Sequence, residues 1–188
     1  MWGRNSEAYS ECPFVTGAFA HAVISGMRSE ERGGETGHIQ AYGGCKHFVP
    51  YDGAALTHAS DFDLFSTYLP GFARCIAAGA LNIMCSYPTP MTAGGTTGAG
   101  SGSCTNHRIL TALAKGTLKF PGNFISDEGA VQNSSSPAAF GGGVDIFLGS
   151  GNPGGELIQQ WLDDGECSPT CLGEDACEGA GWQEREGP

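Results

Sequence analysis

The sequence is poor in the residues that build large hydrophobic cores. Only 34 of its 188 residues are Leu, Ile, Val or Phe, whereas 31 are Gly. A composition this low in core-forming residues, together with a high net charge, leans toward disorder. We therefore expect one domain of ordinary size, or part of a large one, with some of the chain outside any core.

Long apolar runs are also absent. No stretch approaches the ~20 apolar residues that a bilayer span needs, which excludes a transmembrane span. The first residues, Met1 to Asn5, lack the apolar segment of a secretion signal. The compartment is therefore unknown from the sequence, and a secreted, lysosomal or vacuolar protein is expected only if the full-length protein carries a signal peptide.

Positive charge is scarce, with nine Lys and Arg against 20 Asp and Glu and a net charge of -11. Eight of the acids lie in residues 163–188, where Arg185 is the only base. The rest of the chain has no basic surface that could neutralise phosphates, which argues against nucleic acid or an anionic membrane as a partner. We expect a domain over residues 1–165 and a disordered acidic, Gly- and Cys-rich tail over 166–188.

The eight cysteines do not fix the redox compartment. Cys167, Cys171 and Cys177 crowd the tail, but the spacing C-x3-C-x5-C has no fourth Cys or His nearby. A zinc site needs four ligands, so we expect no metal, and no feature implies a cofactor. Most of the five scattered cysteines are expected to be small buried packing residues.

Apolar periodicity predicts short strands that alternate with helices. Ser60 or Asp61 can cap the second helix and Gly79 can end it. A Gly-, Thr- and Ser-rich segment, 92–103, is expected to be a flexible loop that binds no phosphate. The expected helices cover about 11–28, 61–78, 106–116, 137–142 and 155–163, and the expected strands about 38–47, 81–87, 123–126 and 144–148.

This alternation predicts an α/β fold with parallel strands. Four strands cannot close an eight-stranded ring, so we expect a partial TIM-type (β/α)8 barrel of about four βα units. Catalytic residues of such barrels follow the carboxyl ends of strands. Polar clusters occur there after the first three expected strands: Lys46-His47, Ser86-Tyr87 and Ser126-Asp127-Glu128.

The order of these clusters resembles the N-terminal barrel domain of glycoside hydrolase family 3, the β-glucosidase and β-xylosidase family. The resemblance runs from Trp2 to about Asp164. It rests on Trp2-Gly3-Arg4 with Glu7, Ser10-Glu11-Cys12-Pro13, Lys46-His47-Phe48, Asp63-Leu64 with Tyr68-Leu69-Pro70-Gly71-Phe72, Met84-Cys85-Ser86-Tyr87, and Ser126-Asp127-Glu128-Gly129-Ala130-Val131.

The resemblance implies a retaining hydrolysis of O-glycosyl bonds in a β-linked oligosaccharide or glycoside. Asp127 would be the nucleophile that forms a covalent glycosyl-enzyme. Cations such as Arg4 and Lys46 would favour its ionised form. The matching positions of Arg4, Lys46 and His47 bind sugar hydroxyls, Tyr87 lies beside the nucleophile, and Glu7 is expected to orient Arg4.

Several departures from the family pattern leave alternatives open. Glu128 replaces a Trp, Pro88 an Asn and Cys12 an Asp. We expect the missing strands and a second domain with the acid/base Glu in the full-length protein, this chain being an incomplete piece. Glu128 is adjacent to Asp127 and should point away from it, and an Asp–His dyad would use Asp52 and His58. An inactive sugar-binding or inert remnant is the alternative function.

In family members with a similar Cys-Ser-Tyr and a later Cys-x-Asn, the two cysteines are often paired. The resemblance therefore implies a Cys85–Cys104 disulfide, with two reduced cysteines as the alternative. Closing a loop of this length would contribute roughly 3 kcal/mol of stability through chain entropy.

Overall fold

The computed structural model describes residues 4–28, 39, 41–51, 59–87, 103–131, 142–148 and 155–165. The expectations for the tail 166–188, for Asp52 and His58, and for Pro88 lie outside these residues. So do those for the Gly-rich loop up to residue 102 and for the weak helix, apart from its last residue.

The first helix forms where the periodicity predicts it, as α1 (Pro13–Arg28), after a short turn η1 (Asn5–Glu7). Its face carrying Gly17, Ala20 and Ile24 is buried. A Cβ atom at Gly17 would lie 2.9 Å from Cγ of Arg74. Glycine at this position therefore lets α1 approach the following helical segment closely.

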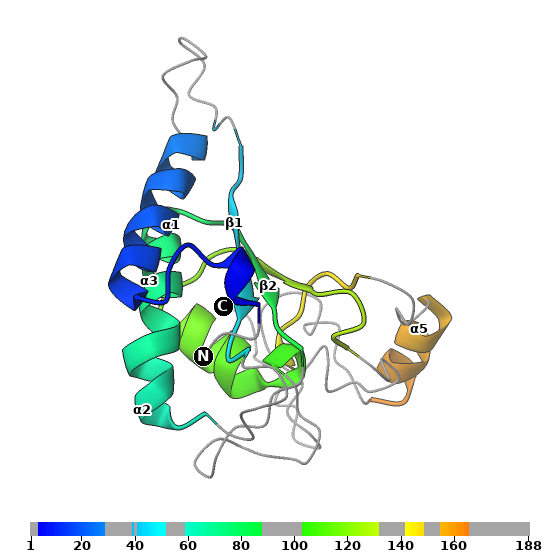
Figure 1. Ribbon diagram of the computed structural model, residues 1–188. Coiled ribbons are helices and arrows are strands. Elements are labelled where there is room, and N and C mark those ends of the chain that lie inside the picture. The colour runs from blue at the N-terminus through cyan, green and yellow to red at the C-terminus, as the bar shows by residue number, and fades with distance from the viewer. Residues whose placement is uncertain are drawn as a thin grey trace.

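That segment is a continuous helical run built from α2 (Asp61–Asp63), η3 (Leu64–Tyr68) and α3 (Leu69–Ala77). Ser60 caps it as predicted: its hydroxyl accepts from the Asp63 amide, and the Asp63 carboxylate accepts from the Ser60 amide. Gly79 follows its end with a φ of +91°, a conformation that glycine adopts without strain. Helices α1, α2 and α3 all lie on one side of the strands (Figure 1).

Three strands form a parallel sheet in the order β1 (Gly44–Phe48), β2 (Asn82–Cys85) and β3 (Asn123–Ser126). The helix between β2 and β3 is η5 (Arg108–Thr117), which follows the turn η4 (Ser103–Thr105). Because each connection is helical and the strands are parallel, all three carboxyl ends meet at one edge of the sheet. The expected α/β class is confirmed for this part of the chain.

The core lies between the sheet and its helices. Phe48 of β1 contacts Phe72 of α3 edge to face, with ring centroids 4.9 Å apart, and contacts Phe124 of β3 at 5.5 Å. Ile83, Ile109 and Leu110 are fully buried in the same cluster. The few large apolar residues of the chain are therefore concentrated on the strands and on the helix faces that pack against them.

Two strand expectations need correction. The first strand begins at Gly44, not near residue 38, and residue 39 together with residues 41–43 precedes it without ladder pairing. Residues 144–148 do not form a full strand, because Ile146 makes a single parallel bridge with Ile125 of β3. The last helix, α5 (Gly155–Asp163), forms where it was predicted and buries Trp161.

Two disulfides are present among the described residues. Cys85 and Cys104 are paired, with Cα atoms 5.2 Å apart, which confirms the bond that the resemblance implied. Cys45 and Cys75 are also paired and join β1 to α3. The interpretation of these two cysteines as packing residues is therefore wrong: sequence alone did not reveal that a strand residue and a helix residue 30 positions apart face each other.

No helix of the described residues combines the length and the apolar character of a membrane span. In the same residues, no three His, Cys, Asp or Glu side chains gather as metal ligands would.

Candidate active site

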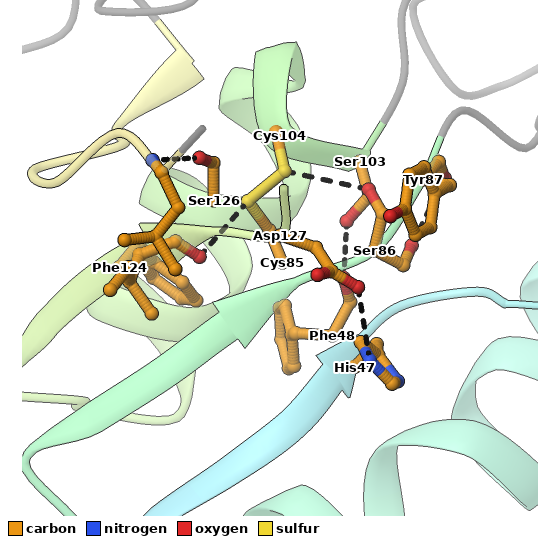
Figure 2. The surroundings of a disulfide bond; sticks show 12 residues. His47, Phe48, Cys85, Ser86, Tyr87, Ser103, Cys104, Phe124, Ser126 and Asp127 are labelled. Atoms are coloured by element: carbon orange, nitrogen blue, oxygen red, sulfur yellow. Dashed lines mark hydrogen bonds and ion pairs between the residues drawn. A yellow bond between two sulfur atoms is a disulfide. The ribbon is translucent and has the colours of Figure 1, made fainter. Parts of the chain in front are cut away.

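The predicted site residues meet at the carboxyl edge of the sheet. Asp127 follows β3 directly, and its carboxylate oxygen Oδ2 lies 3.1 Å from Nε2 of His47 and 3.4 Å from Nη1 of Arg4. The Asp127 side chain is 15% exposed and that of His47 only 1%. Figure 2 shows the Asp127 carboxylate reaching from the end of β3 toward His47 at the end of β1.

An irregularity in β1 explains how two consecutive residues serve one site. Lys46 pairs with Met84 and Phe48 with Cys85, so His47 is an extra residue without a partner on β2. In a regular strand, consecutive side chains point to opposite faces, and a bulge redirects one of them. His47 can therefore approach Asp127 while Lys46 reaches the N-terminal segment.

Glu7 links the two cations of the site. Nε of Arg4 donates to Oε1 of Glu7 at 2.6 Å, and Nζ of Lys46 lies 3.0 Å from Oε2. The bonds from Lys46 and Arg4 lower the pKa of the Glu7 carboxyl, so it is ionised at neutral pH. Glu7 thus contacts Arg4, as a residue that orients it must. Its ion pair with Lys46 was not foreseen from the sequence.

The pKa values of His47 and Tyr87 are shifted in opposite directions. Burial lowers the pKa of His47 despite the opposing charge of Asp127, which favours a neutral imidazole at pH 7. Burial and the Asp127 charge raise the pKa of Tyr87, which keeps its phenol protonated. The Tyr87 hydroxyl donates to the backbone oxygen of Glu128 at 2.7 Å, and the side chain of Glu128 itself is exposed.

Tyr51 is a site residue that the sequence analysis missed. Its ring stacks on His47 with centroids 5.1 Å apart and lies 5.8 Å from the ring of Tyr87. Its side chain is also hydrogen-bonded to Arg4. The signal that could have found it is its position, since it follows the carboxyl end of β1 by three residues.

A cavity of about 670 Å³ begins beside these residues. Its lining includes Glu7, Lys46 and His47 together with apolar side chains of α1 and α3. The cavity lies along β1, and among the described residues β1 pairs only with β2.

The arrangement combines one partly buried carboxylate with a guanidinium, an ammonium, an imidazole and a phenol. Such a set can bind a polyhydroxylated ligand through charged and neutral donors and offer a carboxylate as nucleophile. Comparisons with known proteins identify the family of the chain. A family model described as the glycosyl hydrolase family 3 N terminal domain matches residues 1–166.

The chain belongs to glycosyl hydrolase family 3. It is 35% identical over 143 residues to the probable beta-D-xylosidase 7 of Arabidopsis thaliana, covering 69% of this chain and 18% of that protein. It is 30% identical to the probable beta-glucosidase M of Aspergillus niger, covering 78% of this chain and 19% of that protein. The chain thus spans about a fifth of the length of these curated relatives.

Solved structures of the family share the fold. The beta-glucosidase D2-BGL of Chaetomella raphigera aligns with a TM-score of 0.68 and 26% identity, over 91% of this chain and 23% of that one. A beta-glucosidase of Listeria innocua aligns with a TM-score of 0.71 and 23% identity, over 91% of this chain and 25% of that one.

Proposed function

We propose that this chain carries the nucleophile side of a retaining β-glycosidase site that acts on β-glucosides or β-xylosides. The observation that supports it most is the placement of Asp127, whose carboxylate faces both Arg4 and His47 at the carboxyl edge of a parallel sheet. Relatives of this family bear beta-xylosidase and beta-glucosidase names, which supports the same class of substrate.

In this proposal Asp127 attacks the anomeric carbon and forms a glycosyl ester, which water hydrolyses with retention of configuration. Arg4, which donates to the carboxylate of Asp127, orients it before attack. Arg4, Lys46 and His47 bind sugar hydroxyls, the two cations through charge-assisted hydrogen bonds. Tyr87, beside the nucleophile with its phenol protonated, closes the site on one side.

We further propose that residues 1–165 are a piece of a (β/α)8 barrel and that the described sheet belongs to this piece. The acidic tail 166–188 would lie outside it. The consecutive parallel strands and the helices between them support this. The apolar cavity along the open edge of β1 is the place that a neighbouring strand of the barrel would fill.

The nearby Glu7 is unsuited to act as the acid/base carboxyl, because Lys46 and Arg4 lower its pKa and hold it ionised. A retaining enzyme needs a second carboxyl ~5–5.5 Å from the nucleophile. We propose that a second domain of the full-length protein supplies it. Because an acid catalyst contributes typically 10²–10⁴-fold, this chain alone should hydrolyse ordinary aryl β-glucosides negligibly.

The two disulfides support a proposal about the compartment. Disulfides persist in oxidising environments and are rare in the cytosol. Pairing of Cys45 with Cys75 and of Cys85 with Cys104 therefore favours a secreted, lysosomal or vacuolar location.

The experiment separates attack by Asp127 from acid catalysis. The purified chain is incubated with 2,4-dinitrophenyl 2-deoxy-2-fluoro-β-glucoside and with the matching xyloside. Their leaving group departs without protonation, and the fluorine slows hydrolysis of the ester. We expect intact-protein mass spectrometry to show one added sugar and peptide mapping to place it on Asp127, with no labelling of Asp127→Asn.

The alternative function, an inactive sugar-binding or inert remnant, predicts a different result. A remnant that keeps the sugar site would bind glucose or xylose in a calorimetric titration and leave Asp127 unlabelled by either probe. Labelling at another carboxylate, retained in Asp127→Asn, would contradict the assignment of the nucleophile.

A further inference from the structure

Two buried serine hydroxyls anchor the backbone around the end of β1. Oγ of Ser86 donates to the carbonyl oxygen of Pro50 at 2.8 Å, and Oγ of Ser103 donates to the carbonyl oxygen of Phe48. The amide of Ser86 donates to that same Phe48 oxygen at 2.6 Å. Both serines are almost fully buried, at 0% and 3% exposure, so these bonds form away from competing water.

The disulfide Cys85–Cys104 holds the two serines side by side. Ser86 follows one of its cysteines and Ser103 precedes the other, although the cysteines are 19 positions apart in the sequence. Sγ of Cys104 lies 3.4 Å from the carbonyl oxygen of Ser86. Figure 2 shows the disulfide and both serines directly above the end of β1 and the Asp127 carboxylate.

The anchored backbone carries the residues that face the nucleophile. His47 immediately precedes Phe48, and Tyr51, whose ring stacks on His47, immediately follows Pro50. Within the described part of the chain, neither ring nitrogen of His47 has a hydrogen-bond partner of regular geometry, even though Nε2 is 3.1 Å from Asp127. Among the described residues, the imidazole is therefore held by its backbone, by the stacked ring of Tyr51 and by its close approach to the Asp127 carboxylate.

We propose that Ser86 and Ser103, brought together by the Cys85–Cys104 bond, are positioning residues that keep His47 against Asp127. The disulfide then sets the geometry of the site in addition to stabilising the chain. This inference rests on the proposed function for the role of the site, but its test measures the contact between His47 and Asp127 directly.

The test follows the ring nitrogens of His47 by NMR across pH, with the resonances assigned through His47→Asn. The charged and titratable groups around this ring are Asp127, Lys46, Arg4 and Glu7, with Tyr51 stacked on it. As a single substitution, Asp127→Asn should shift the ring-nitrogen resonances of His47 and lower the pH of its titration midpoint. The reason is that the negative charge of Asp127, which favours the protonated imidazole, is lost. When Asp127→Asn is introduced into the Ser86→Ala/Ser103→Ala variant, we expect most of this response of His47 to be lost.

A matched control removes the same kind of bond elsewhere. Oγ1 of Thr111 donates to the carbonyl oxygen of Gly142 at 3.4 Å, away from the site. Thr111→Val should therefore keep the full response of His47 to Asp127→Asn. Cys85→Ala/Cys104→Ala should lose the response as the serine variants do. Denaturant unfolding confirms that each variant folds, and the single serine variants, each with one anchor left, replace the double variant if it does not.

A full response in folded Ser86→Ala/Ser103→Ala would overturn the proposal. A full response only in the cysteine variant would overturn the part assigned to the disulfide. If the response is lost as expected but the fluorosugar probes leave wild-type Asp127 unlabelled, the positioning role stands and the glycosidase proposal fails. The two proposals are therefore tested separately.

Discussion

The two ends of the same small sheet carry polar side chains of different kinds. At the amino ends of the strands, Asn82 donates from Nδ2 to Oδ1 of Asn123 at 2.6 Å, a neutral pair on adjacent strands. At the carboxyl ends, the carboxylate of Asp127 meets Arg4 and a buried His47 whose nitrogens lack hydrogen-bond partners of regular geometry in the described residues.

The difference distinguishes polar side chains that stabilise the sheet from polar side chains that serve a functional site. The asparagine pair satisfies itself, as buried polar groups in a stable structure usually do. At the carboxyl edge, within the described residues, the ring nitrogens of His47 keep hydrogen-bonding capacity that a ligand could use. Polar groups that lack hydrogen-bond partners are expected where binding or catalysis takes place.

The first prediction concerns the carboxyl edge of the sheet, where the largest effect on labelling is expected. Arg4→Gln removes the guanidinium that faces Asp127 while keeping a polar side chain. Loss of this charge-assisted hydrogen bond should slow labelling of Asp127 by the fluorosugar probe roughly 10- to 100-fold. Time-resolved mass spectrometry measures the rate. As the matched control, Arg108→Gln breaks an exposed ion pair with Asp61 and should leave the rate unchanged.

The second prediction concerns the disulfide that the sequence did not reveal. Cys45 lies near the amino end of β1, and its bond to Cys75 closes a loop of 30 residues. Its removal in Cys45→Ala/Cys75→Ala should lower the free energy of unfolding by roughly 3 to 4 kcal/mol. Urea unfolding of both proteins measures it, and a loss as small as that of an exposed Ser66→Ala variant would contradict the expectation.

The third prediction concerns the pH dependence of stability that the buried His47 causes. The buried His47 has a lowered pKa, so the unfolded chain binds a proton more readily than the folded one below the unfolded value of 6.5. Stability should therefore fall as the pH drops from 6.5 toward the folded pKa, by at most about 1.4 kcal/mol per pH unit for one proton. Denaturant unfolding at several pH values measures the slope. His47→Gln should show a smaller slope, and an equal slope in both proteins would exclude His47 as its source.

The smallest effect is expected at the amino edge. Asn82→Ala leaves the Asn123 amide without its partner and should cost about 1 kcal/mol in the free energy of unfolding. The double variant with Asn123→Ala should recover part of this loss, because no unpaired amide remains. Both variants should keep the wild-type rate of Asp127 labelling; a slowed rate would mean that the two ends of the sheet are coupled.

Much of the fold follows from local pattern. The limits of β3 and α5 and the cap at Ser60 were predictable, because apolar periodicity and capping residues act within a few positions. The start of β1 and the single bridge at Ile146 were not, because ladder pairing depends on which segment lies alongside. Strand limits of this kind are set by tertiary neighbours.

The candidate site divides in the same way. The resemblance singled out Arg4, Lys46, His47, Tyr87 and Asp127 because each follows a strand or sits in a family motif. Ser86 sits in a family motif but was given no role of its own, and Tyr51 and Ser103 lie outside the motifs. The contacts of these three residues with His47 and with the backbone depend on the bulge and on the disulfide.

The sequence by itself determined the parallel α/β pattern, the order of the motifs and the residue types at the strand ends, since these depend on local spacing and chemical identity. Only the tertiary structure decided that Glu7 joins Arg4 to Lys46, that Cys45 pairs with Cys75 and that buried serines anchor the backbone beside His47. Each of these contacts joins residues on different elements. Their distances are set by how helices and strands pack together, which spacing along one chain does not encode.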